Sequence, residues 1–117
     1  MGKVANLHLE KGRALKVAGR YDEALAELRT ALSEEPECAE AQHQIGLVLG
    51  FVGEFDDSLA ALQRAVDLDP GNTTARNDLA LTYAMLGMYD EARAAFGEVL
   101  RLDPANEKAR TNLDLFP

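Results

Sequence analysis

The sequence lacks tryptophan, has one cysteine, and contains no apolar run of the ~20 residues that a helix needs to span a bilayer. Cys38 has no second cysteine with which to form an internal disulfide, which fits a reducing compartment. The N-terminus also lacks the apolar core of a signal peptide. We therefore expect a cytoplasmic protein with no membrane partner.

Basic residues are also scarce. Twelve Lys and Arg stand against 20 Asp and Glu, giving a net charge of -8, which argues against a nucleic-acid partner. Between residues 37 and 70, Arg64 is the single basic residue among seven acidic ones. This uneven charge has two interpretations: solvated helix faces, or an acidic flank that steers a neutral to basic partner.

The sequence contains none of the residue patterns that catalysis or metal binding requires. His8 and His43 have no cysteine or carboxylate at metal-ligand spacing, such as H-x3-H. The glycines do not form a phosphate-binding loop, and no Ser-His-Asp or Cys-His order is present. We expect no enzyme activity, no cofactor and no metal site.

What the sequence does contain is an internal repeat of 34 residues. Pro36, Pro70 and Pro104 follow one another at this spacing. The glycines and aromatics that share the spacing are Gly19, Gly53, Gly87, Tyr21, Phe55 and Tyr89. A fixed period of this length is the signature of a solenoid of stacked units.

Each unit contains two stretches with helical periodicity, separated by the glycine and ended by the proline. Glycine suits the turn because it can take the positive φ that closes a helix. The pattern predicts helices over residues 5–18, 21–34, 39–52, 55–68, 73–86, 89–102 and 106–116.

Small residues recur where the two helices of a unit should approach most closely. In the first helices these are Gly12, Gly46 and Ala80, and in the second helices Ala24, Ser58 and Ala92. We expect large side chains to fill the neighbouring space, namely Leu28, Leu62 and Phe96.

These residues resemble the tetratricopeptide repeat, whose 34-residue pattern is W-x2-L-G-x2-Y…A-x3-F…P. The third unit matches best, and its matching residues are Leu79, Ala80, Tyr83, Ala92, Phe96 and Pro104. The tryptophan position holds His8, Gln42 and Arg76. The resemblance implies an all-α fold, a right-handed α-α superhelix of three helix-turn-helix repeats and a closing helix. A single domain over 1–117 would comprise repeats at about 5–38, 39–72 and 73–106 and a capping helix at about 106–116.

The two ends of the chain depart from the repeat. Lys11 occupies the position of Ile45 and Leu79, so we expect that side of the first helix to face water, as terminal repeats require. In the closing helix, an apolar stripe should face the preceding helix, whereas Asp114 stands where a further hairpin would need a small residue. The stripe consists of Ala109, Leu113 and Phe116.

By resemblance, the first helices of the repeats line a concave groove that binds a peptide or helix of a partner protein. The groove residues carried over from the family are Leu9, Arg13, Val17, His43, Gln44, Leu47, Phe51, Asn77, Asp78, Leu81, Met85 and Asn112. Amides among them can pair with a peptide main chain, and apolar members offer contact surface. Acidic side chains in and beside the groove suggest a neutral to basic partner.

Chaperone-binding relatives clamp a C-terminal carboxylate with basic and amide side chains. The matching positions here are Leu9, Arg13, Gln44, Thr74 and Asp78, of which one is basic, so we do not expect such a clamp.

Three alternatives stay open. The groove-facing apolar residues can simply pad the packing between repeats. The chain can also self-assemble into a homo-oligomer through exposed apolar residues, rather than remain a monomer. Finally, the repeats can act as a passive spacer within a larger protein.

Overall fold

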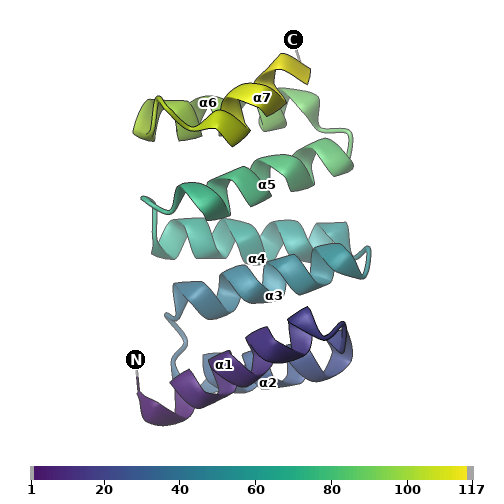
Figure 1. Cartoon of the computed structure of the whole chain (residues 1–117), viewed down its shortest axis with the longest axis vertical. Helices are drawn as coiled ribbons and strands as arrows, with labels where there is room; N and C mark the ends of the chain where they lie inside the picture. The colour runs from purple at the N-terminus through teal and green to yellow at the C-terminus, as the bar shows by residue number, and fades with distance from the viewer. Residues whose placement is uncertain (1, 116–117) are drawn as a thin grey trace.

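The computed structural model describes residues 2–115, which form seven helices joined by short turns (Figure 1). The helices are α1 (Lys3–Val17), α2 (Tyr21–Glu34), α3 (Ala39–Phe51), α4 (Phe55–Leu68), α5 (Thr73–Met85), α6 (Tyr89–Leu102) and α7 (Glu107–Leu115). These bounds confirm the predicted helices, with a difference of two residues at the start of α1 and one residue or none at most other ends.

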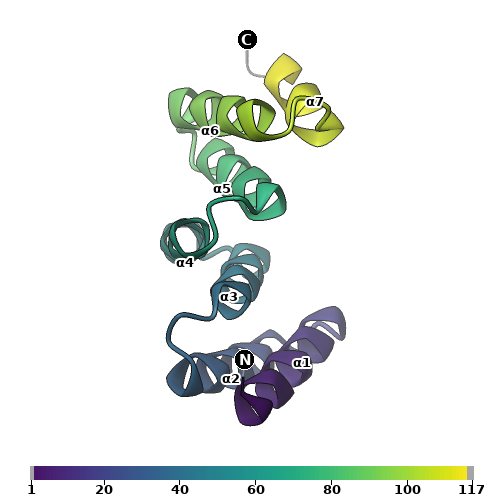
Figure 2. The ribbon, with the colours of Figure 1, turned by 90° about the vertical axis from the view of Figure 1, so that its left-hand side faces the viewer.

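The helices stack into an elongated molecule of 43 × 26 × 20 Å, with the termini at opposite ends (Figure 1). The chain forms three helical hairpins, and each hairpin packs on its neighbours through α2 against α3 and α4 against α5. Figure 2 shows two layers: α1, α3, α5 and α7 lie on one side, and α2, α4 and α6 on the other. We call these the inner and the outer helices.

The turn within each hairpin depends on one glycine. Gly19, Gly53 and Gly87 have φ values of 77°, 85° and 76°, in the left-handed region that residues with a Cβ rarely adopt. This confirms the role predicted for them.

The predicted close approach between the helices of a hairpin is also confirmed. A Cβ added to Gly12 would lie 2.6 Å from the Leu28 side chain, and one added to Gly46 would lie 2.6 Å from Leu62. Opposite Gly46, the Ser58 hydroxyl donates a hydrogen bond to the Gly46 carbonyl oxygen over 2.7 Å. The glycines therefore bring the two helix backbones together while the leucines fill the space beside them.

The first turns of three inner helices are capped at the same repeat position. The Asn72 and Asn106 side chains accept hydrogen bonds from the backbone N–H groups of Ala75 and Ala109, each over 3.0 Å. At the equivalent position before α3, the Cys38 sulfur accepts from Ala41 over 3.4 Å and is buried. Cys38 is thus a cap and a core residue of the stack.

The ends of the stack follow the expected pattern. Lys11 is exposed, whereas Ile45 and Leu79 are buried at the equivalent positions. In α7, Ala109 is fully buried and Leu113 packs on the cluster that contains Phe96. The predicted third member of that stripe, Phe116, lies outside the described residues. Within residues 2–115, none of the helices has both the length and the apolar character needed to cross a membrane.

Candidate functional site

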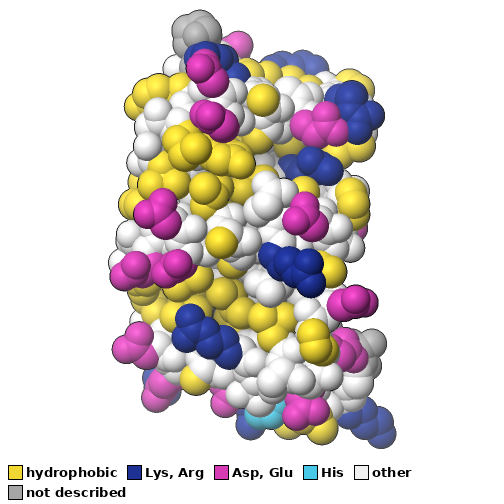
Figure 3. Space-filling model, turned by 180° about the vertical axis from the view of Figure 1, so that it is seen from behind, with side chains coloured by type: hydrophobic (Ala, Val, Ile, Leu, Met, Phe, Trp, Pro, Cys, Tyr) yellow, Lys and Arg dark blue, Asp and Glu magenta, His cyan; other side chains and the backbone are white. Residues whose placement is uncertain are grey.

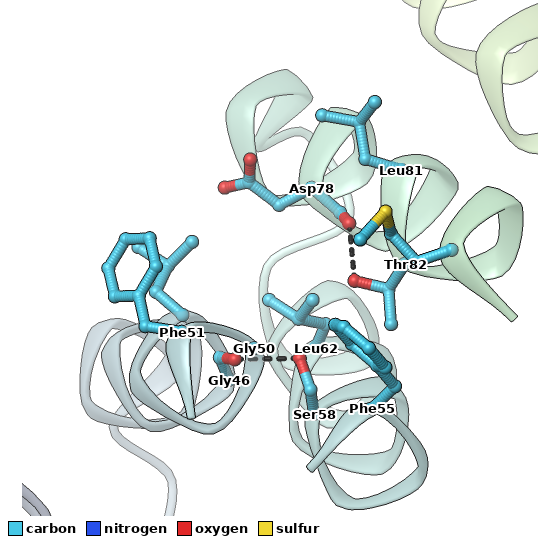
Figure 4. A pocket seen from close by; sticks show the side chains of 11 residues that line it. Gly46, Gly50, Phe51, Phe55, Ser58, Leu62, Asp78, Leu81 and Thr82 are labelled. Carbon is cyan, nitrogen blue, oxygen red and sulfur yellow. Dashed lines mark hydrogen bonds between the residues drawn. The ribbon is translucent and has the colours of Figure 1, made fainter. Parts of the chain in front are cut away.

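An open hollow lies between the inner helices α3 and α5, with α4 as its floor (Figure 4). Its volume is about 200 Å³. Five of the predicted groove residues line it together: Leu47, Phe51, Asp78, Leu81 and Met85. The other lining residues are Gly46, Gly50, Phe55, Ser58, Leu62 and Thr82. Residues more than 30 positions apart in sequence therefore share one surface.

The lining of the hollow is apolar apart from a few groups, most of which already have partners. The Ser58 hydroxyl is bonded to the Gly46 carbonyl, and the Thr82 hydroxyl donates to the Asp78 carbonyl oxygen over 2.8 Å (Figure 4). Asp78 is the one charged residue of the lining. The hollow thus offers apolar contact and, at one end, a carboxylate.

Three predicted groove residues form an exposed apolar row along the last turns of the inner helices. Val17, Phe51 and Met85 occupy the same repeat position and have exposed fractions of 85%, 60% and 66%. The Phe51 ring also lies beside Tyr21 of α2, with ring centroids 5.7 Å apart and an interplanar angle of 34°. Large apolar side chains left this exposed in a row mark a surface suited to contact with another molecule.

Beside the apolar hollow, the inner helices α1, α3 and α5 carry polar side chains that bind one another, in part across helices. His43 Nε2 lies 2.7 Å from Asp78 Oδ2 and so joins α3 to α5. The Gln44 amide nitrogen donates to Glu40 over 2.7 Å and its oxygen accepts from Lys16, while Arg13 lies 3.4 Å from Glu40. We call this set of residues the polar clasp: Arg13, Lys16, Glu40, His43, Gln44 and Asp78.

Two members of the polar clasp, Lys16 and Glu40, are absent from the predicted site. Helical spacing could have found them, since Lys16 follows Arg13 by three residues and Glu40 precedes Gln44 by four, which places each pair on one helix face. Burial lowers the pKa of Lys16, and the nearby positive charge of Arg13 lowers it further, while Glu40 and Asp78 partly oppose both effects. Lys16 is therefore a constrained cation rather than a freely solvated one.

Four predicted groove residues are buried, which corrects the expectation that they face a partner. Leu9 is 4% exposed and belongs to the core between the first two hairpins. His43 and Gln44 are buried within the polar clasp. Asn77 is 3% exposed, and its amide nitrogen donates to the Asn106 side chain over 3.1 Å. Leu9, His43 and Asn77 share one repeat position, which faces the neighbouring helices of the stack, whereas Gln44 is covered by the side chains of Lys16 and Glu40 that bind it.

Asn112 lies at a second open hollow, of about 490 Å³, between α5 and α7. Leu81 lines this hollow as well as the first, so the two adjoin along the inner face. The other lining residues are Glu107, Lys108 and Thr111, which make the second hollow more polar. In the part of the chain that the structure describes, no group of three His, Cys, Asp or Glu residues could hold a metal ion.

The stacked hairpins and the hollowed inner face define an α-helical repeat solenoid. The family model of the tetratricopeptide repeat matches residues 9–49 and 43–107, and the chain belongs to this family. No curated protein sequence matches the chain at a significant level.

Solved tetratricopeptide structures share the fold over nearly the whole chain. The first such domain of Spaghetti (RPAP3), bound to an HSP90 peptide, has a TM-score of 0.94 and 22% identity, covering 99% of this chain and 92% of that one. The domain of OM64 from Arabidopsis has a TM-score of 0.92 and 20% identity, with coverage of 97% and 94%. YrrB, described as having an unusual peptide-binding site, has a TM-score of 0.84 and 30% identity; the match covers 96% of this chain and 58% of YrrB.

Proposed function

We propose that this chain is a protein-interaction module that binds a segment of a partner protein along its inner helices. The observation that carries the proposal is the apolar hollow between α3 and α5, continued by the exposed row of Val17, Phe51 and Met85. A concave site with apolar walls and few polar groups is the common form of a binding site. The second hollow, beside Asn112, extends this surface toward α7.

The structural neighbours support binding as the general function. The first domain of Spaghetti was solved with an HSP90 peptide, and the second domain of human RPAP3 with an HSP70 peptide. We extend peptide binding to this chain from the shape of its inner face. Binding rather than catalysis is proposed, since most polar side chains of that face already pair with one another.

The same inner face argues against a chaperone tail as the ligand. Among the positions that would form a carboxylate clamp, Leu9 is buried, Arg13 pairs with Glu40, and Asp78 carries a negative charge. Asp78 would repel a C-terminal carboxylate at short range. We therefore propose a neutral to basic partner segment.

Site-specific photo-crosslinking tests the proposed function. The photoreactive residue p-benzoylphenylalanine would replace Phe51 or Met85 on the inner face, and Ala60 or Ala94 on the outer helices as matched controls, all of which are exposed. We expect crosslinks to a partner protein from the inner positions in cells that express the chain. The outer positions should give none.

Other crosslink patterns would contradict the proposal. Crosslinks from the inner positions to a second copy of the chain, together with a mass that rises with concentration, would indicate self-assembly instead. Equal crosslinking from inner and outer positions, or none from either, would favour a passive spacer.

A further inference from the structure

We infer that the hollow between α3 and α5 takes a partner segment in which one large apolar side chain stands next to a lysine or arginine. This inference rests on the proposed function and specifies the chemistry of the partner. The two observations behind it are the apolar lining of the hollow and the negative charge at both of its ends.

The size and lining of the hollow define the apolar part of the ligand. A closed apolar cavity of about 150 Å³ is known to bind benzene, so the space here, about 200 Å³, admits one leucine or phenylalanine side chain. Leu47 and Phe51 form one wall, and Leu81 and Met85 the other. Because the hydroxyls of Ser58 and Thr82 are already bonded within the chain, the hollow does not favour a polar side chain.

Asp78 supplies the charge at one end of the hollow. One carboxylate oxygen accepts from His43, and the side chain retains 17% exposure. The cations of α1 nearest to it, Lys16 and Arg13, are engaged with Gln44 and Glu40. Neither lysine nor arginine lines the hollow itself. A cationic group of the ligand would therefore meet a carboxylate there without a competing positive charge in the lining.

The turn between α3 and α4 supplies negative charge at the other end. Glu54, Asp56 and Asp57 are exposed and flank Phe55, which lines the hollow. In the first and third hairpins, Arg20 pairs with Glu23 and Arg93 with Asp90.

The second hairpin has Glu54 and Leu59 at the positions of those two arginines. Glu54, Asp56 and Asp57 consequently form no ion pair within the described part of the chain. Figure 3 shows acidic side chains at mid-height on the left edge of the outer face, with hydrophobic side chains above and below them.

The spacing along α5 sets the distance between the apolar and the cationic parts of the ligand. Asp78 precedes Leu81 and Thr82 by about one helical turn, or ~5.4 Å. An extended peptide advances ~3.3 Å per residue, so the cation should stand within one or two residues of the apolar side chain. The ligand class is thus an apolar residue with an adjacent basic residue in an extended segment.

Selection from a peptide library tests this inference. The probe is a library of random nonapeptides with leucine or phenylalanine at the centre and an amidated C-terminus, selected on the full chain. We expect lysine or arginine to be enriched within two residues of the centre. Binding of the selected peptides should be lost with Met85→Glu, a change at an exposed side chain of the hollow.

A charge comparison then assigns the preference to Asp78. Replacing the basic residue of a selected peptide by glutamine should weaken binding to the parent chain by about 2- to 5-fold, the range of an exposed or partly exposed ion pair. The same replacement should have little effect on binding to Asp78→Asn, in which the amide oxygen can still accept from His43. Asp67→Asn removes an equal charge from the far end of α4 and should behave as the parent.

The outcomes separate this inference from the proposed function. Two results would overturn the inference and leave peptide binding in place. In the first, the selected peptides depend on Met85 but lack basic residues. In the second, Asp78→Asn weakens the binding of a basic peptide and of its glutamine variant by the same factor. If none of the selected peptides depends on Met85, both the inference and the proposed function are wrong.

Discussion

At the scale of single residues, Gly46 of α3 lies where this helix packs closely against α4, and a side chain at this position would clash with α4. A Cβ at this position would lie 2.6 Å from the Leu62 side chain, which is 1% exposed, and 3.3 Å from the Leu62 backbone nitrogen, which belongs to the helix and cannot give way independently. Gly97, in the middle of α6, is exposed and has no atom near the position of a Cβ. The two helical glycines therefore differ: there is no space for a side chain at Gly46, whereas there is open space for one at Gly97.

We predict that Gly46→Ala lowers the free energy of unfolding by about 1–2 kcal/mol. Overpacking of a tight core costs about 1–3 kcal/mol, which exceeds the gain of up to ~1 kcal/mol from replacing a helical glycine. Gly97→Ala is the matched control and should raise stability by about 0.5–1 kcal/mol, because only the helix preference acts there. Urea denaturation measures both, and equal effects of the two variants would contradict the packing argument.

At the scale of the helices, the inner helices α3, α5 and α7 begin at a side-chain cap, whereas the outer helices begin with acidic residues. Asn72 holds the first turn of α5, and Asp56 with Asp57 lies in the first turn of α4. The first arrangement satisfies a specific backbone N–H group, and the second interacts with the helix dipole. In each turn that leads from an outer helix to the next inner helix, a single side chain therefore caps the helix that follows.

We predict that Asn72→Ala lowers the free energy of unfolding by about 1 kcal/mol, since it removes the cap of α5. Thr74→Ala, two residues later and exposed, is the control and should change stability by no more than about 0.5 kcal/mol. Thermal and urea unfolding of both variants measure the difference. A loss as large for Thr74→Ala would show that the cap is not the cause.

At the scale of the whole molecule, each hairpin contacts only its neighbours, so the ends of the stack have less support than the middle. The outward side of α1 exposes Val4, Leu7 and Lys11, while α7 is the last helix and buries only Ala109 completely. By contrast, the hairpin of α3 and α4 packs on the first hairpin through α3 and on the third hairpin mainly through α4. In such a solenoid, stability is a sum over repeats and their interfaces.

We predict that amide hydrogen exchange is slowest in α3 and α4 and fastest in α1 and α7. The protection of the end helices should be about tenfold lower or more, because they open without unfolding the middle of the stack. Exchange measured by NMR or mass spectrometry on the full chain tests this. Equal protection in all seven helices would instead indicate that the described chain unfolds in one cooperative step.

The sequence by itself determined the helices, their turns and their order. These features depend on local chemistry: the positive φ of Gly53, the missing N–H of Pro70 and the 34-residue period that fixes how the hairpins stack. The recurrence of small residues located the close approach at Gly46, and the resemblance to the family indicated that Phe51 and Met85 lie on the inner face.

Only the tertiary structure decided which polar residues remain available to a partner. His43 and Asp78 are 35 residues apart, and they bond because the packing of α3 beside α5 brings their side chains within hydrogen-bonding distance. Likewise, Asn77 of α5 bonds to Asn106, the residue that caps α7, and so leaves the surface. A repeat position specifies which face a side chain lies on, but its contacts depend on the residue that the adjacent helix brings against it. Which side chains meet across two helices depends on their distance in the folded molecule, and the repeat pattern of the sequence does not specify this distance.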